Sequence, residues 1–193
     1  MNPQLRQIST EINDATARAR NVVENLHAGL AGRRPHPSSW SVEECIAHLT
    51  MTTDAFLAVI RPAIDRARNQ QLLDAGTTFG MGLSARLLAW WLEPPYRTKS
   101  KTSAAFVPGS EQSARALPDF LDRQSRLLDL IAEADGLALD RIQIASPFAP
   151  RMKYNVYAAL RLIAVHQRRH LWQAEHVARR LLAVQAGGSA NCE

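Results

Sequence analysis

The chain has 193 residues, of which 46% are hydrophobic and 21% are charged, and it carries a formal net charge of +5. This composition is typical of a globular protein that buries a continuous core, and it excludes a largely disordered chain. The positive charge comes from scattered arginines and not from a basic run interleaved with aromatic residues, which argues against nucleic acid as a partner.

Cysteine use and hydropathy indicate the compartment. Cys45 and Cys192 are the only cysteines, and the second lies in a Gly-rich tail, so we expect no structural disulfide. The N-terminus is polar and lacks the basic-then-apolar order of a secretory signal. The most apolar run, residues 83–92, is about half as long as a membrane span. We therefore expect a cytoplasmic protein with no membrane partner.

Two helices are predicted in the first part of the chain. Apolar residues at three- and four-residue spacing predict a helix over about 3–28. A Ser-x-x-Glu capping box at Ser41 and Glu44 predicts a second helix over about 42–68. Pro62 is expected to kink or interrupt the last turns of this helix.

The segment after the second helix, residues 70–107, is too long for an ordinary connection in a bundle. Its glycines loosen the chain, and the apolar run LSARLLAWWL predicts a short helix that a Pro-Pro pair ends. We expect this insert to cover the bundle or one of its openings. The Trp90/Trp91 pair is expected either to pack the insert on the bundle or to join a dimer interface.

The third long helix is predicted within residues 110–135, with Gly136 at its C-terminal stop. Pro118 leaves two interpretations open. Either the helix starts at this proline, or Ser110 caps a short preceding helix that breaks at Leu117.

The fourth helix is predicted from Asn155, a candidate N-cap, to about residue 184. No segment shows the turn chemistry of a strand pair, so the expected fold class is all-α. These elements predict one domain over residues 1–186 and a disordered tail over residues 187–193.

Two of the six histidines stand out on the fourth helix. His166 and His170 are four residues apart, so they share one face and lie one turn apart. They interrupt an apolar stripe that includes Ala159, Ile163 and Ala174, which predicts that both imidazoles point inward. Each is then either a hydrogen-bonded core histidine or a metal ligand, and one cation satisfies both buried rings at once.

A third imidazole, that of His48, is predicted on the inward side of the second helix. Three neutral imidazoles from two helices make an open metal site, with positions left for water or substrate. The other histidines are excluded by position. His27 lies at the end of the first helix, His36 in a Pro-rich linker, and His176 on another face of the fourth helix.

Two segments resemble the DinB-like superfamily, which includes the YfiT-type proteins. In WSVEECIAHL (residues 40–49) the tryptophan and the histidine have the family's separation, and HQRRHLWQ (residues 166–173) has its His-x-x-x-His followed by a glutamine. The resemblance implies an up-down-down-up four-helix bundle, often dimeric. It also implies one nickel, zinc or iron ion on three ligands: His48, His166 and His170.

The resemblance further implies a metal-dependent transferase that acts with a low-molecular-weight thiol, such as bacillithiol, mycothiol or glutathione. The alternative is a non-catalytic stress-response or binding module in which the metal site is structural. The chain departs from the family pattern in the insert at 70–107 and in Pro118, both of which affect the mouth of the expected pocket.

No side chain presents itself as a general base. Glu44 and Thr52 are each one turn from His48, and Gln173 lies close to the direction of His166. The capping box is the stronger role for Glu44, and the other two residues equally suit holding an imidazole in place.

Cys45 lies on the same stripe of the second helix as His48. It is either an additional metal ligand or, more simply, a small core residue. Four arginines of the fourth helix would suit an anionic thiol if they faced the pocket. The helical wheel turns most of them outward, so no substrate site is predicted on Arg168, Arg169, Arg179 and Arg180.

Overall fold

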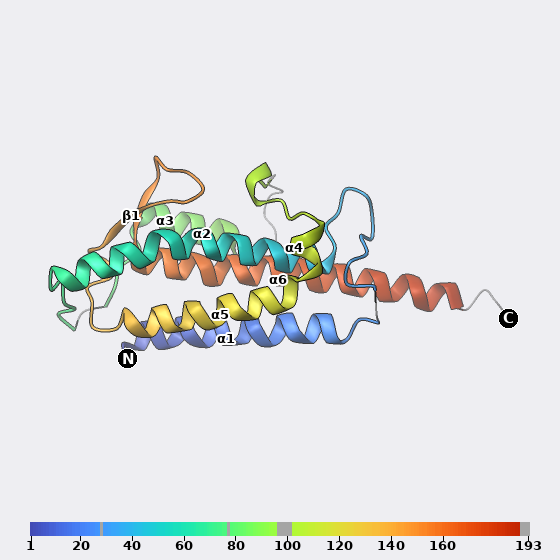
Figure 1. Ribbon diagram of the computed structural model, residues 1–193, viewed down its shortest axis with the longest axis horizontal. Helices are drawn as coiled ribbons and strands as arrows, with labels where there is room; N and C mark the ends of the chain where they lie inside the picture. Colours follow the sequence, from blue (N-terminus) through green and yellow to red (C-terminus); the bar gives the residue numbers. More distant parts are fainter. Residues whose placement is uncertain (28, 77, 96–101, 190–193) are drawn as a thin grey trace.

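The computed structural model describes residues 1–27, 29–76, 78–95 and 102–189, and it is mostly helical (Figure 1). Four long helices follow the long axis of the molecule. They are α1 (Pro3–Glu24), α2 (Val42–Asn69), α5 (Ala116–Glu133) and α6 (Val156–Ser189). The all-α fold predicted from the sequence is confirmed. No helix in the described part of the chain is long and apolar enough to cross a membrane.

The first helix begins where its cap predicts and ends earlier than expected. The Asn2 side chain accepts a hydrogen bond from the backbone N–H of Gln4, and a proline occupies the first helical position. The helix ends at Glu24 instead of residue 28, with Asn25 as its C-cap. Gly29 adopts a positive φ of 82° in the turn that follows the helix, and it is not the residue that ends the helix.

The second helix confirms the predicted capping box. The Ser41 hydroxyl accepts a hydrogen bond from the backbone of Glu44 at 3.1 Å, and the Glu44 carboxylate accepts one from the backbone of Ser41 at 2.7 Å. Pro62 does not interrupt α2, which continues to Asn69. Its neighbours Ile60 and Ile64 are fully buried, so their packing outweighs the roughly 3 kcal/mol that an internal proline costs.

The insert forms a cover on α6. Its helix α3 (Leu83–Leu92) has the predicted bounds and packs against α6. A single 3₁₀ turn, η1 (Ala104–Phe106), follows later and contacts α2. Residues 77 and 96–101 of the predicted insert lie outside the described residues.

Both interpretations of Pro118 are partly right. A short helix, α4 (Ser110–Ala114), precedes α5, as the second interpretation requires, but its N-cap is Gly109 and not Ser110. The break lies at Arg115 instead of Leu117, and Pro118 stands in the first turn of α5, where its missing N–H would have no helical partner anyway.

A short hairpin precedes α6 and was not predicted. Its strands, β1 (Gln143–Ala145) and β2 (Lys153–Asn155), pair antiparallel with Ile144 opposite Tyr154. Strands of three residues are too short to show a period-two pattern. The Asn155 side chain then accepts a hydrogen bond from the backbone of Ala158 at 2.8 Å, which confirms it as the N-cap of α6.

Helix α6 is longer than predicted and reaches beyond the other helices at its C-terminal end (Figure 1). It ends at Ser189 instead of residue 184, so residues 187–189 of the predicted disordered tail are helical. Residues 190–193 lie outside the described residues. The single domain over residues 1–186 stays a prediction.

The core has two apolar parts with a polar layer between them. Helices α1 and α2 each pack against both α5 and α6. One apolar cluster includes Ile8, Ile60 and Leu127, and the other includes Ile46 and Phe120. Between them, two buried glutamines from facing helices hydrogen-bond to each other in both directions: Gln124 and Gln167.

Candidate metal centre

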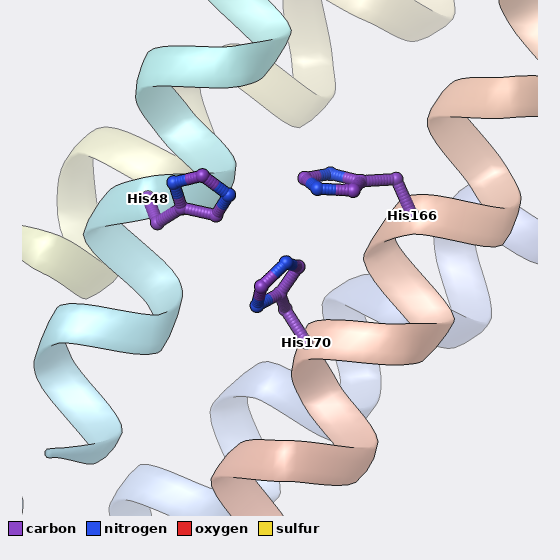
Figure 2. A group of neighbouring side chains, drawn as sticks. All are labelled: His48, His166 and His170. Carbon is purple, nitrogen blue, oxygen red and sulfur yellow. The ribbon is translucent and has the colours of Figure 1, made fainter. Parts of the chain in front are cut away.

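Three histidines from two helices come together at the level of this polar layer. His48 projects from α2, and His166 and His170 project from successive turns of α6 toward it (Figure 2). One ring nitrogen of each lies within 4.8 Å of the others, and the ring centroids are 4.5 to 5.2 Å apart. The three side chains that the sequence singles out therefore form one cluster, which could hold a metal ion.

The spacing and the burial of the cluster both bear on whether it fits a cation. A tetrahedral zinc ion with bonds of about 2.0–2.1 Å places its ligand nitrogens about 3.3 Å apart, which small rotations of the rings would achieve. Nδ1 of His170 is buried and has no hydrogen-bond partner among the residues that the structure describes. An unpartnered buried nitrogen is unfavourable, and it marks His170 as a polar residue whose place in the core is not explained by packing alone.

A main-chain carbonyl fixes the orientation of His48. Its Nδ1 lies 2.8 Å from the carbonyl oxygen of Phe106, in η1. A carbonyl only accepts hydrogen bonds, so Nδ1 carries the proton and donates it. The other nitrogen, Nε2, is thereby left unprotonated, as a metal ligand must be.

Burial keeps the histidines neutral. Desolvation lowers the pKa of His166 to about 3, and the charges of the neighbouring His48 and Arg169 act in the same direction. Desolvation also lowers the pKa of His170, where contact with Gln173 is a weaker opposing effect, and that of His48, where the bond to Phe106 opposes it. Neutral imidazoles are the form that binds metal ions.

Trp40 holds two of the rings in place. Its ring centroid lies 5.9 Å from that of His170 in a stacked arrangement and 5.0 Å from that of His48. In the sequence Trp40 stands next to Ser41, the N-cap of α2, and its contact with α6 is a tertiary one. The separation of the tryptophan and the histidine in WSVEECIAHL is the signal that could have assigned it to the site.

The cluster opens into a cavity of about 950 Å³. The three histidines line it together with aromatic side chains from α2, from the loop after β1 and from η1, including Phe56, Phe148 and Phe106. A cavity of this volume is at the upper end of the range for sites that bind small molecules.

Comparison with known proteins identifies a family. Residues 11–174 match the family model of the DinB superfamily. The chain belongs to the DinB superfamily. The match includes the insert and all three histidines of the cluster. No curated protein matches the chain, and no solved structure does.

Glu44 is committed to structure in this DinB protein. Besides the capping box, its carboxylate accepts a hydrogen bond from Nε of Arg34 at 2.8 Å. Burial acts to raise the pKa of Glu44, but the bonds from Arg34 and Ser41 outweigh it and hold the pKa below its usual value. The preference for a capping role over a general base is therefore supported.

Thr52 and Gln173 both line the cavity. The Thr52 hydroxyl lies within hydrogen-bond distance of the main-chain carbonyls of His48 and Leu49, at 3.0 and 3.1 Å, so its proton is used within α2. Gln173 contacts His170, whereas the sequence places it near the direction of His166. Of the two, Gln173 is the one that can hold an imidazole of the DinB cluster.

Cys45 takes the simpler of its two predicted roles. It is fully buried in an apolar cluster, and it is not part of the group of possible ligands within the described residues. Desolvation raises the pKa of its thiol, with a smaller contribution from Glu44, so the thiol stays protonated.

The prediction that most arginines of the fourth helix face outward is wrong for Arg169, whereas Arg179 and Arg180 are exposed. Arg169 is only 5% exposed and lines the cavity, with its guanidinium 5.3 Å from the ring centre of Trp91. Arg180 lines the cavity too. Arg168 instead pairs with Glu93 at 2.9 Å. The helical wheel alone could not show that α3 covers the side of α6 on which Arg169 lies.

The three excluded histidines lie outside the cluster, as predicted. His27 and His36 are exposed. His176 lies on a later turn of α6, where its Nδ1 is 2.8 Å from the carbonyl oxygen of Trp172, but it does line the cavity.

Proposed function

We propose that this DinB protein is a metal-dependent transferase that acts with a low-molecular-weight thiol. One divalent ion, nickel, zinc or iron, would be held by His48, His166 and His170. The observation that carries the proposal is the placement of three neutral, converging imidazoles in the wall of a cavity of about 950 Å³. A structural ion needs no such opening, whereas a catalytic one requires open positions for its substrate.

The roles of the residues follow from their positions. When bound, a divalent ion would lower the pKa of a thiol that it binds and so supply a nucleophile at neutral pH. Phe106 orients His48 through its carbonyl, and Trp40 restrains His48 and His170 by ring contact. Together these residues pre-orient the ligands and so reduce the entropy lost on binding.

The reaction transfers the sulfur of the thiol to an electrophilic carbon. The S–H bond breaks, a C–S bond forms, and the bond from carbon to its leaving group breaks, with the electron pair going to the leaving group. No aspartate or glutamate lines the cavity within the described part of the chain. We therefore propose that the thiol proton passes to solvent through the mouth of the cavity and not to a carboxylate base.

We propose the up-down-down-up topology for the bundle, and the order of ion pairs supports it. Glu11 pairs with Arg161 at 2.6 Å, and Arg18, later on α1, pairs with Glu175, later on α6, at 2.7 Å. This order is that of two helices that run in the same direction. The same order relates α2 to α5 through two further pairs, Asp54 with Arg123 and Arg61 with Glu133.

A homodimer is also part of the proposal. Helix α3 leaves a row of large apolar side chains exposed at three- and four-residue spacing, namely Leu83, Leu87 and Trp90. Trp91, by contrast, packs over Arg169. Trp90 is the more exposed member of the pair, which favours it over Trp91 for a contact with a second copy of the chain. Light scattering on the wild type and on Leu87→Glu tests this surface.

The first experiment measures bound metal by inductively coupled plasma mass spectrometry. Purified wild type is expected to bind about one divalent ion per chain, and His170→Ala is expected to lose most of it. His176→Ala is the matched control, because His176 lies on the same helix and lines the same cavity but stays outside the cluster. Undiminished metal in the His170→Ala protein would reject the site.

The second experiment measures thiol conjugation to monochlorobimane, with bacillithiol, mycothiol and glutathione tested separately. Conjugation is expected with the metal-loaded protein and is expected to stop when a chelator removes the ion. Metal binding without conjugation of any of these thiols would favour the non-catalytic module, in which the ion is structural.

A further inference from the structure

The cavity changes character along its length, and the three histidines lie at the boundary. Its lining residues on α6 run from Leu162, one turn before His166, to Arg180, well beyond His170. At 1.5 Å per residue this stretch of helix spans about 27 Å. The cavity is therefore long enough to extend to both sides of the histidines.

The side toward the start of α6 is mostly apolar, with Ser146 as a polar member of the lining. Phe148, in the loop after β1, packs edge-on against Phe56 at 5.2 Å and against Phe106 at 4.9 Å between ring centroids. Leu162 and Tyr154, both almost fully buried, also line this side. We name these five aromatic and aliphatic residues the aromatic compartment.

The side toward the end of α6 carries polar and basic side chains, with Val177 as an apolar neighbour and Arg180 at the exposed end. Trp172, Gln173, His176 and Arg180 line it from α6, and serines of the linker before α2 line it from across the cavity. We name these four residues of α6 the basic compartment. Buried Arg169 lies beside the histidines and also lines the cavity, with its guanidinium held by Trp91 and Leu92.

Charge and polarity therefore select different ligands on the two sides. The aromatic compartment offers ring faces and edges, which favour an apolar or aromatic group. The basic compartment offers a guanidinium and hydrogen-bonding side chains, with no acidic residue among the lining residues that the structure describes, which favours an anion.

Resting on the proposed thiol transfer, we propose that the cavity binds two ligands at once on opposite sides of the three histidines. An apolar electrophile occupies the aromatic compartment, and an anionic thiol occupies the basic compartment. The sulfur of the thiol and the electrophilic carbon of the acceptor then meet at the histidines. The acceptor class is accordingly an uncharged, apolar compound, and the thiol class is one that carries carboxylate groups.

Two unreactive probes test simultaneous binding. N-phenyl-1-naphthylamine is uncharged and reports binding by fluorescence, and S-methylglutathione is anionic and is followed by titration calorimetry. Both are expected to bind, and saturation with either is expected to change the Kd of the other by less than about twofold, since a tenfold change would signal direct competition. Mutual displacement, or failure of either probe to bind, would overturn the proposal.

Two variants assign the probes to the compartments. Phe148→Ala is expected to weaken naphthylamine binding about threefold or more and to leave the anion unaffected, and Phe148→Leu is expected to restore most of the loss. Arg180→Gln is expected to weaken the anion about three- to fivefold at low salt only. Exposed residues outside the cavity supply the controls: Leu182→Ala and Arg20→Gln. If each variant affects both probes equally, or affects neither probe, the division of the cavity into two compartments is wrong.

The two proposals fail separately. Neither probe reacts, so both titrations are run with metal-loaded and with chelator-treated protein. Independent binding of the two probes without thiol conjugation would reject the transferase and leave the two compartments standing. Conjugation accompanied by direct competition between the probes would support the transferase and reject the two compartments.

Discussion

Nδ1 of His48 lies 2.8 Å from the main-chain carbonyl oxygen of Phe106, and this bond joins residues that are 58 positions apart in the chain. One partner is a member of the histidine cluster, and the other is the last residue of a 3₁₀ turn in the insert. The ring of Phe106 also packs against Phe148 in the cavity wall. Residue 106 therefore connects the wall to the proposed metal ligand.

This connection predicts that loosening Phe106 weakens metal binding. Phe106→Ala removes the ring contact with Phe148 but keeps the carbonyl, so the carbonyl is held less firmly. We expect metal affinity to fall roughly tenfold, the lower end of the range for groups that orient a ligand. Competition with a chromogenic chelator measures the affinity. Phe106→Leu keeps an apolar side chain and is expected to recover most of it; equal losses in both variants would show that the carbonyl does not depend on this packing.

Trp40 provides an optical test of the same centre. Its ring is stacked on His170, whereas Trp90 is 56% exposed on α3. A paramagnetic ion such as Co²⁺ bound at the histidines is expected to quench the fluorescence of Trp40. Trp40→Phe should therefore lose much of the quenching that Co²⁺ causes, and Trp90→Phe should retain it. Equal quenching in both variants would place the ion elsewhere.

Local hydrogen bonding and helical periodicity account for what the sequence predicts well. Ser41 and Glu44 define the start of α2 because both halves of a capping box lie within four residues. His166 and His170 share a face for the same kind of reason, since four residues are about one helical turn. The grouping of these histidines with His48 needed one further assumption, that α2 and α6 pack together, which is confirmed.

Contacts between distant segments account for the rest. The carbonyl of Phe106 carries no side-chain signal, so no pattern could pair it with His48. Arg169 stands at the edge of the polar face of its helix, and its burial depends on α3 returning over that edge. The break at Arg115 and the three-residue strands are too short to alter the periodicity that the prediction uses.

Substitution of Glu44 tests whether this residue acts only in the capping box or also as a general base. Glu44→Gln keeps the hydrogen-bonding pattern of a capping box and loses the charge that pairs with Arg34. We expect thiol conjugation within about twofold of wild type and a loss of less than about 1 kcal/mol in the free energy of unfolding. Glu44→Ala, which removes the cap as well, is expected to lose about 1 kcal/mol more. A large drop in conjugation with Glu44→Gln at normal stability would identify Glu44 as a base after all.

The histidines make the metal-free protein sensitive to acid. A histidine in the unfolded chain takes up a proton near its ordinary pKa of 6.5, whereas folded His166 does so only at about 3. Between these values the unfolded state binds more protons, so stability is fully present above the unfolded pKa and falls as the pH drops below it. The expected contribution of His166 is at most about 1.4 kcal/mol per pH unit.

Urea unfolding in the presence of a chelator, from about pH 7.5 to about pH 5, measures this slope. His166→Gln removes one titrating group and is expected to give a shallower dependence than wild type. His27→Gln, at an exposed position outside the cluster, is the matched control. An unchanged slope in the His166→Gln protein would show that this histidine is not desolvated in the apoprotein.

The glutamine pair beside the cluster predicts an asymmetry in stability. Gln124 donates to the side chain of Gln167 at 3.1 Å, and it also reaches the carbonyl of Ile12 and the hydroxyl of Thr16. Gln167 donates back to Gln124 at 2.7 Å and is 1% exposed. Gln124→Leu therefore leaves Gln167 buried without this partner, whereas Gln167→Leu leaves Gln124 with two others.

Because an unsatisfied buried polar group costs about 1–3 kcal/mol, Gln124→Leu is expected to lower the free energy of unfolding more than Gln167→Leu does. In the double variant no glutamine is left unpaired, so its loss should be smaller than the sum of the single losses by about 1 kcal/mol or more. Chemical denaturation of the four proteins gives this coupling directly. Strict additivity would mean that the two amides do not depend on each other, and the polar layer would then contribute no mutual restraint to the helix that carries His166 and His170.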